Sequence, residues 1–366
     1  MNFLKYPGGK ERELKFIKPI LPNFKNYYEP FVGGGSVYLD MVADHYFIND
    51  KSNDLMNIYQ CIQNQDQTFY SILNDFQSDW SLISETVKDL SSYILNKYNQ
   101  ARSSEEIKID DLFENDNWLK LKISNKSHNQ FIKIAKQTVN RKINRMLCLE
   151  TQKGKLIESD IIANIEGSLK SAFYTVLRNL YNTLDSKSSL KTAAYLFLRE
   201  TCYSSMFRFN SKGEFNVPYG GLSYNDKKLN AKVDFYSSEY VRKKMAITTL
   251  CNEDFADFIA QCRPSSSDFM FLDPPYDSDF STYDQNVFGE KDQRRLSEFL
   301  INECPCKFLL IIKNTELINK LYKSGQKCAN GLFLNIRPFS HQYLVSFKNR
   351  NNKNTNHLLI GNFNFN

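Results

Sequence analysis

The sequence predicts an α/β protein in which one doubly wound sheet is divided by a long helical insert. Short apolar runs alternate with helical patterns near both ends of the chain, which is typical of βαβ units. Between residues 55 and 200 the pattern changes to amphipathic helices with few β-branched runs. Glycines within residues 202–221 then indicate a β-hairpin with a tight turn. We therefore expect a discontinuous α/β domain, residues 1–54 and 225–366, and an insert, residues 55–224, that ends in the hairpin.

The composition of the chain is that of a soluble globular protein. Of its 366 residues, 42% are hydrophobic and 24% are charged. No apolar run approaches the roughly 18 residues that a membrane span needs, and the N-terminus has no signal-peptide core. The eight cysteines lack the spacing of a zinc site, which predicts reduced thiols in a cytoplasmic protein and no metal. A net charge of +6 favours a polyanionic partner.

The N-terminal elements follow the order of a βαβ unit. We expect a helix over residues 11–20, a strand that runs into the glycine turn Gly33–Gly35, and a helix over residues 36–43. A second strand, residues 46–50, ends in Asp50.

The alternation of strands and helices resumes after the insert. We expect strands over residues 247–251, 269–272, 307–312, 342–347 and 357–363. The polar residues 349–356 predict a hairpin loop between the last two strands.

The most informative motif follows the apolar run Phe269–Leu272. Asp273-Pro274-Pro275-Tyr276 places an acid, two prolines and an aromatic ring at a strand end. The Asp273 carboxylate and the Pro274 carbonyl can each accept one hydrogen of an amino group, and the fixed φ of proline holds the carbonyl direction. Tyr276 offers a flat face for stacking. The motif predicts a site for an amine on a nucleobase; the alternative is a strand terminator with a buried Tyr276.

The glycine turn and Asp50 point to an adenosine-containing ligand. A glycine-rich turn between a strand and a helix lets a ligand approach the backbone, and no Gly-Lys-Ser/Thr follows that would make it a phosphate loop. An acid at the end of the second strand is where such folds hold a ribose diol. A merely flexible turn, and a capping role for Asp50 in competition with Ser52, are the alternatives.

Two shorter segments are candidates for the same ligand. Lys10, in Tyr6-Pro7-Gly8-Gly9-Lys10, could neutralise a ligand carboxylate, or the segment could be a loop with an exposed lysine. Asp254 and Phe255 follow a strand and could place an acid and a ring beside an adenine. The alternative for this pair is a helix N-cap and a core phenylalanine.

The ordered set of motifs resembles a known family. Tyr6–Lys10, Glu29–Ser36 (Glu-Pro-Phe-Val-Gly-Gly-Gly-Ser), a strand ending in Asp50, Arg208–Gly220 (Arg-Phe-Asn-Ser-Lys-Gly-Glu-Phe-Asn-Val-Pro-Tyr-Gly) and Asp273–Tyr276 are similar to the Dam-type DNA N6-adenine methyltransferases of the alpha group, class I. The resemblance covers roughly residues 1–60 and 200–365 and implies a Rossmann-like methyltransferase sheet with an inserted target-recognition domain.

The resemblance also implies roles for individual residues. Asp273, Pro274 and Tyr276 would be catalytic, and Phe280 and Tyr283 would lie near the extruded base. The residues expected to bind S-adenosylmethionine are Tyr6, Lys10, Phe31, Gly33, Gly35, Asp50, Asp254, Phe255 and Asp273. The chain departs from the family pattern at Tyr6, where tryptophan is usual, and at Ser204-Ser205-Met206, where Asn-Gly-Leu is common.

Basic residues of the insert are candidates for contact with DNA. Lys133, Lys136, Arg141, Lys142 and Arg145 have spacings that let much of the set share a helix face, which could contact phosphates or simply be solvated. Arg208 matches the major-groove edge of guanine, with a structural salt bridge as the alternative.

We therefore predict an S-adenosylmethionine-dependent adenine methyltransferase that acts on a base flipped out of double-stranded DNA. It would be bacterial or phage-encoded, and either solitary or paired with a restriction endonuclease. The alternatives are an RNA adenine methyltransferase and a catalytically silent DNA-binding protein. Methylation of a protein glutamine is disfavoured, because enzymes of that kind usually have asparagine at the position of Asp273.

Overall fold

A computed structural model describes residues 3–6, 9–103, 119–184, 188–275, 288–342 and 354–365. The chain divides into two compact units. We call Met1–Gln63 together with Glu239–Asn366 the sheet unit, and Asn64–Ser238 the helical unit. None of the described helices is long and apolar enough to cross a membrane.

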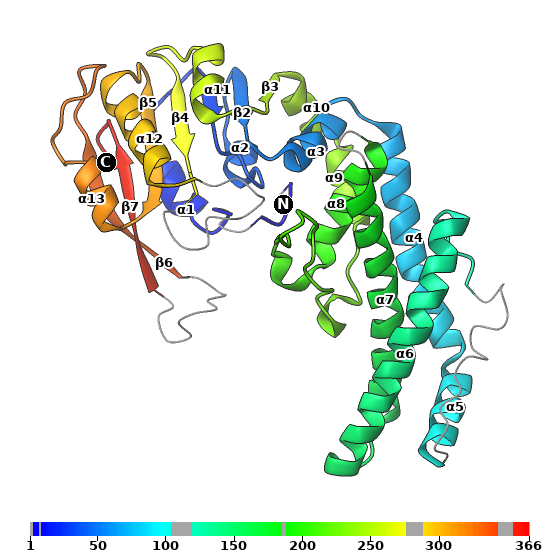
Figure 1. The fold of residues 1–366 in the computed structure, drawn as a ribbon. Helices are drawn as coiled ribbons and strands as arrows, with labels where there is room; N and C mark the ends of the chain where they lie inside the picture. Colours follow the sequence, from blue (N-terminus) through cyan, green and yellow to red (C-terminus); the bar gives the residue numbers. More distant parts are fainter. Residues whose placement is uncertain are drawn as a thin grey trace. The chain divides into compact units, whose positions relative to one another are not determined.

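The sheet unit contains seven strands in the order β3-β2-β1-β4-β5-β7-β6 (Figure 1). The strands are β1 (Asn26–Glu29), β2 (His45–Asn49), β3 (Thr248–Cys251), β4 (Phe269–Leu272), β5 (Lys307–Lys313), β6 (Asn335–Gln342) and β7 (Asn354–Gly361). Neighbours from β3 to β5 pair in parallel, whereas β7 runs antiparallel to both β5 and β6. The predicted doubly wound α/β sheet is confirmed.

Helices cover both faces of the sheet. They are α1 (Leu14–Ile17), the 3₁₀ helix η1 (Lys18–Ile20), α2 (Ser36–Asp40), α3 (Asn53–Gln63), α10 (Glu239–Ala246), α11 (Phe255–Cys262), α12 (Glu290–Asn302) and α13 (Glu316–Leu321). On one face, Met270 and Leu272 pack in a cluster with residues of α11, α12 and α13. On the other face, Tyr27 and Phe269 pack against Phe24. Because both faces are covered, β4 is buried throughout and reads as a continuous apolar run.

Some sequence-predicted elements differ from the structure. The helix expected over residues 11–20 is a short α1 that tightens into η1, where Pro19 cannot donate a backbone hydrogen bond. Of the strand expected over residues 342–347, the structure describes only Gln342, the last residue of β6, and residues 343–347 lie outside the described part of the chain. Pro338 interrupts the strand pattern of β6, so the sequence does not predict a strand there. Proline is nevertheless tolerated on an edge strand, and β6 is an edge strand of the sheet.

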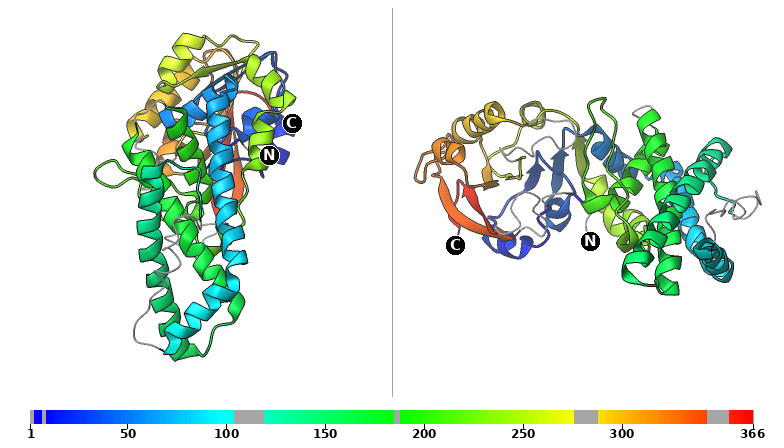
Figure 2. Two further views of the ribbon diagram at one scale, coloured as in Figure 1. Left: turned by 90° about the vertical axis from the view of Figure 1, so that its right-hand side faces the viewer. Right: turned by 60° about the horizontal axis from the view of Figure 1, so that its bottom comes forward.

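The helical unit is built from long helices that lie side by side (Figure 2). Its elements are α4 (Gln67–Asp89), α5 (Ser91–Ser103), α6 (Asn125–Lys153), α7 (Glu158–Thr183), α8 (Ser189–Thr201), the 3₁₀ helices η3 (Tyr203–Ser205) and η4 (Leu222–Tyr224), and α9 (Asn230–Tyr236). The buried residues Phe131, Ala135, Val139 and Ile143 repeat at intervals of four and form the apolar stripe of α6. Trp80 anchors the core against Phe173 and Phe197.

Residues 202–221 do not form the regular β-hairpin that the sequence predicts. The two arms meet only at isolated bridges, Cys202 with Tyr219 and Phe209 with Phe215. Side chains of α7 take up backbone groups that a regular hairpin would pair: Tyr174 and Arg178 donate to the Val217 carbonyl, and Asn182 bonds both backbone groups of Phe215. This segment, which we call the docked loop, is therefore fastened to α7 as well as by a few backbone hydrogen bonds between its own arms.

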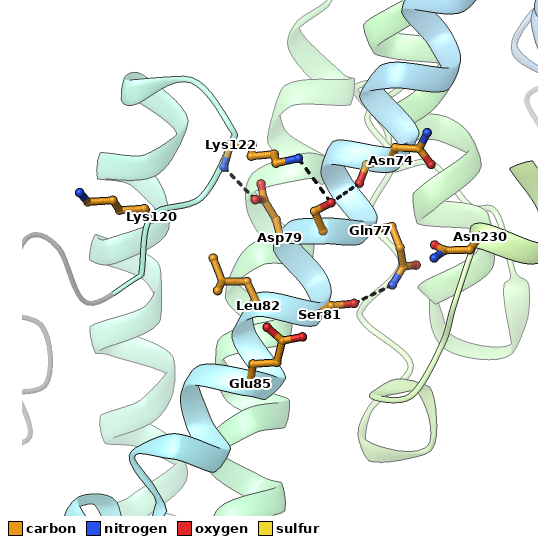
Figure 3. Close-up of a pocket in the computed structure, with 10 residues that line it drawn as sticks. Asn74, Gln77, Asp79, Ser81, Leu82, Glu85, Lys120, Lys122 and Asn230 are labelled. Atoms are coloured by element: carbon orange, nitrogen blue, oxygen red, sulfur yellow. Dashed lines mark hydrogen bonds between the residues drawn. The ribbon is translucent and has the colours of Figure 1, made fainter.

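A buried acid fastens the described segment of the helical unit that begins at Leu119. The Asp79 carboxylate accepts hydrogen bonds from the backbone N–H groups of Lys122 (2.7 Å) and Ile123 (3.2 Å) beside an open pocket of about 560 Å³ (Figure 3). Lys122 Nζ bonds Asp75 at 2.9 Å. Burial, only partly offset by the two N–H groups, raises the pKa of Asp79 to about 6.

The points at which the chain leaves and re-enters the sheet unit lie close together. Gln63, the last residue of α3, donates from Nε2 to the Met245 carbonyl (3.0 Å) and to the Thr248 carbonyl (2.7 Å). Its side chain therefore ties the end of α3 to the segment that joins α10 and β3. The predicted domain boundary at residues 54 and 55 falls inside α3, a helix that packs within the sheet unit.

Candidate active site

The topology places the switch point of the sheet between β1 and β4. From β1 the chain moves outward to β2 and β3, then returns to β4 on the opposite side of β1. In an open α/β sheet, such a reversal opens a ligand site at the carboxyl ends of the strands. Asp50, Asp254 and Asp273 all follow the carboxyl ends of strands that belong to this parallel part of the sheet.

The glycine turn after β1 is tightly packed. Gly33 has φ of +48° and Gly35 has φ of +69°, values that L side chains rarely adopt. A Cβ at Gly34 would lie 2.6 Å from the Leu4 carbonyl oxygen, and one at Gly35 would lie 2.5 Å from the Tyr59 hydroxyl. The turn is therefore a close approach of backbone segments and not simply a flexible loop. The Tyr6 ring packs over Gly33, where a Cβ would lie 3.2 Å from it.

Asp50 links the glycine turn to the segment after β2. Its Oδ2 accepts the Gly33 N–H at 3.1 Å, and its Oδ1 accepts the Ser52 N–H at 3.0 Å. Ser52 Oγ in turn accepts the Leu55 N–H in the first turn of α3, so the capping role falls to Ser52. These two bonds hold the half-buried Asp50 carboxylate at the carboxyl end of β2, beside the glycine turn.

Asp254 and Phe255 have the structural roles that the sequence left as an alternative. Asp254 is the N-cap of α11 and accepts the Ala256 N–H, and Phe255 is buried in the core. Arg295 on α12 bonds Asp254 at 2.7 Å. Burial alone would raise the pKa of Asp254, but the hydrogen bonds from Arg295 and Ala256 outweigh it, so the pKa lies below its usual value.

An aromatic cluster lies beside this helix start. Phe31, in the turn after β1, has its ring centroid 5.7 Å from that of Phe255 and 5.5 Å from that of Phe288. The Arg295 guanidinium lies over the Phe255 ring at 5.0 Å. Phe31 is only half-buried, so one apolar face between the glycine turn and α11 is available to a ring-bearing ligand.

Asp273 is held by a lysine from the far end of the sequence. Lys10 Nζ lies 2.5 Å from Asp273 Oδ2, and Lys10 is 3% exposed, so it is not the exposed loop lysine of the alternative interpretation. Its backbone N–H donates to Ser36 Oγ at the start of α2. Pro274 is buried. The predicted residues Tyr276, Phe280 and Tyr283 lie outside the described part of the chain.

One acid at the site escaped the sequence reasoning. Glu29, the last residue of β1, is 2% exposed, and its Oε2 accepts the Tyr27 hydroxyl at 2.7 Å. Burial raises the pKa of Glu29 well above its usual value, and the nearby charge of Asp273 adds to the effect. A signal is present in the sequence, because Glu29 ends a buried strand and begins the motif Glu29–Ser36, but the predicted roles within that motif fell on later residues.

The candidate DNA-contacting residues differ in exposure. On α6, Lys133, Arg141 and Arg145 are exposed, whereas Lys136 and Lys142 are half-buried at the edges of the apolar stripe. Burial lowers the pKa of Lys142, with a further effect from Arg145. Arg208 on the docked loop is exposed, and within the described residues it forms no salt bridge of the kind that the alternative required.

A doubly wound sheet with a packed glycine turn and an acid at its switch point defines an α/β enzyme of the nucleotide-binding type. The family model of the D12 class N6 adenine-specific DNA methyltransferases matches residues 6–332. The chain belongs to this family and is an adenine-specific DNA methyltransferase with the Rossmann-like methyltransferase fold. The resemblance drawn from the sequence is confirmed.

Named relatives agree with this assignment. The Type II methyltransferase M.MjaIII of Methanocaldococcus jannaschii is 25% identical over 341 residues, which cover 88% of this chain and 87% of the relative. The Type II methyltransferase M.CviBI of Paramecium bursaria Chlorella virus NC1A is 37% identical over 129 residues, 35% of this chain and 46% of the relative. The DNA adenine methylase of Serratia marcescens is 22% identical over 329 residues, 88% of this chain and 86% of the relative.

The family implies a methyl donor and a DNA substrate. Among the residues that the structure describes, no group of three or more His, Cys, Asp or Glu side chains is arranged to hold a metal ion.

Proposed function

We propose that this enzyme transfers the methyl group of S-adenosylmethionine to the 6-amino group of an adenine flipped out of double-stranded DNA. The observation that carries the proposal is the position of Asp273 at the end of β4, across the switch point from the glycine turn and in contact with Lys10. A carboxylate followed by a buried proline carbonyl presents two acceptors, which is what an amino group with two hydrogens requires.

The residues around the switch point fit this cofactor. The packed glycine turn lets a ligand reach the backbone, and Asp50 would accept hydrogen bonds from a ribose diol because it follows the second strand and contacts that turn. Tyr6 and Phe31 would offer apolar surfaces for the adenine, with Phe255 packed behind Phe31, and Lys10 is the cation that could also reach the methionine carboxylate. When bound, S-adenosylmethionine would supply an electrophilic methyl group.

The chain's own residues would then position the amine. Asp273 and the Pro274 carbonyl would accept its two hydrogens, which favours a pyramidal nitrogen whose lone pair is no longer delocalised into the ring, and stabilises the positive charge that develops on nitrogen. Lys10 would hold the direction of the Asp273 carboxylate. Tyr276 would stack on the base. Asp273 need not be a strong base beforehand, because the nitrogen becomes acidic as it gains the methyl group.

We further propose how the enzyme contacts DNA. The exposed cations of α6 would contact phosphates and make binding salt-dependent, while Arg208 would read a base edge. Since some relatives are called Type II methyltransferases and others DNA adenine methylases, pairing with a restriction endonuclease and a solitary role are both supported. A DNA substrate also supports action in the cytoplasm of a bacterial or phage-infected cell.

Modification-sensitive long-read sequencing tests the proposal. Plasmid DNA from an adenine-methylation-deficient host that expresses the chain should carry N6-methyladenine within one short sequence. Asp273→Ala should abolish methylation while duplex binding stays within about threefold of wild type. The reason is that Asp273 is expected to contact the flipped base and no other part of the duplex. Wild-type turnover by Asp273→Ala, or methylated RNA with unmodified DNA, would overturn it.

A further inference from the structure

A glutamine outside the recognised motifs contacts the catalytic tetrapeptide. Gln293 lies in the first turns of α12, 18 residues beyond Pro275, and is 0% exposed. Its Nε2 donates to the Pro275 carbonyl at 2.9 Å. Its Oε1 is also buried and has no hydrogen-bond partner within the described residues. Burial of a polar amide costs free energy unless its polar atoms are hydrogen-bonded, so a buried glutamine with this contact calls for an explanation.

The contact falls on a backbone torsion that the prolines leave free. The orientation of Pro274 and Pro275 depends on four torsions. The two φ angles are held by the rings, and ψ of Pro274 is restricted because a proline follows it. Only ψ of Pro275 remains, and it sets the direction of the carbonyl that Gln293 binds. Rotation about that bond does not move the Pro274 carbonyl, so what the hydrogen bond adds is an anchor from the end of the rigid Pro274-Pro275 unit to α12, which fixes the position of the unit.

We propose that Gln293 is a positioning residue for methyl transfer, which acts by locking the Pro274-Pro275 segment so that Asp273 and the Pro274 carbonyl converge on the amine. The inference rests on the proposed function of these two acceptors. Gln293 would not touch the substrate. Its effect would be on the rate of the chemical step, since small displacements of reacting groups cost rate more than binding.

The same helix offers contrasts to Gln293. Arg295, two residues further along, bonds Asp254 and therefore supports the start of α11 rather than the tetrapeptide. Arg294 is exposed and, among the described residues, its ion pair is with Glu290 on its own helix. Arg294→Ala is thus the matched control, a change in the same turn of α12 that should leave transfer unchanged.

Two substitutions separate positioning from structural support. Gln293→Met keeps the approximate shape and removes the donor; since Pro275 is exposed, its carbonyl can bond water when the donor is gone, and the fold should survive. Gln293→Glu keeps a donor only while its carboxyl is protonated. Above that range the carboxylate would repel the Pro275 carbonyl, so the loss of rate should grow as pH rises.

The measurement is the single-turnover rate of methyl transfer from tritiated S-adenosylmethionine to unmethylated plasmid DNA between pH 6 and pH 9, because product release often limits kcat. We expect a loss of about 10- to 100-fold for Gln293→Met, with cofactor Kd within about twofold and Tm unchanged. The ratio of Gln293→Glu to wild type should fall with pH, and that profile stands even if Gln293→Met does not fold.

Either of two results would overturn the inference: a wild-type rate in Gln293→Met, or a ratio of Gln293→Glu to wild type that does not change with pH. Wild-type enzyme that fails to methylate adenine in DNA would instead refute the proposed function. The two failures are therefore distinguishable in the same assay.

Discussion

Lys10 Nζ lies 2.5 Å from Asp273 Oδ2, although the two residues are 263 positions apart. The backbone of Lys10 is bonded to Ser36 Oγ directly after the glycine turn. One residue therefore joins the N-terminal motif, the start of α2 and the carboxylate after β4. The direction of the Asp273 carboxylate depends on this lysine as much as on its own strand.

Removal of the Lys10 charge should slow methyl transfer. Lys10→Met would leave the carboxylate without its cation and free to turn, and we expect the single-turnover rate to fall by about 100-fold. Lys10→Arg should retain part of the activity because it keeps the charge. Lys15→Met, a change at an exposed lysine in α1, is the control. A wild-type rate in Lys10→Met would show that the ion pair has no part in catalysis.

The docked loop should depend on Asn182. Its side chain exchanges two hydrogen bonds with the backbone of Phe215, at 3.0 Å and 2.9 Å. Asn182→Ala removes both, and we expect a loss of about 2 kcal/mol of stability in the helical unit. Hydrogen exchange at the Phe215 amide should accelerate. Asn179→Ala, one turn earlier on α7, should change neither; unchanged exchange in Asn182→Ala would contradict the docking role.

A turn within the docked loop carries removable strain. Ser204 and Ser205 have φ of 53° and 52°, and the Met206 N–H closes the turn on the Tyr203 carbonyl. Left-handed φ at both central positions suits Asn-Gly, the pair common in the family. We expect Ser205→Gly to add about 0.5–1 kcal/mol of stability in urea denaturation. Ser211→Gly, without positive φ, should instead reduce stability; the same sign for both would refute the strain.

Asp79 should make the helical unit pH-sensitive. Because burial raises its folded pKa from 3.8 to about 6, the folded state holds the proton more tightly than the unfolded chain does. Its contribution to stability is therefore complete below about pH 4 and lost as pH rises through about 6. Urea denaturation at pH 4, 5 and 6, followed by the fluorescence of Trp80 and Trp118, should show this slope in wild type. Asp79→Asn should flatten it; an equal slope would exclude Asp79 as the cause.

The strands and their terminal acids were predictable because their pattern is local. The apolar run Phe269–Leu272 and the acid after it are adjacent in the sequence, so a buried strand with Asp273 at its end could be inferred directly. The glycine turn and Asp50 are close enough in sequence to be read together for the same reason.

The contacts that position these groups were not predictable. Lys10 reaches Asp273, and Gln293 reaches Pro275, only because the sheet brings separate segments together. The irregular docked loop also depends on tertiary contacts, since α7 side chains such as Tyr174 and Asn182 take the backbone bonds that sequence alone assigned to a hairpin.

The Gln63 contact has a consequence for the order of folding. Asn49, at the end of β2, bonds Glu253, which is 204 residues away, so β3 can dock only after the whole helical unit has been synthesised. Closing a loop of that length costs about 2 kcal/mol more than closing one a tenth as long. If the helical unit folds first, the loop that must be closed becomes short, and the Gln63 hydrogen bonds join its two ends. Ribosomal synthesis would therefore complete the helical unit before the sheet that carries Asp273.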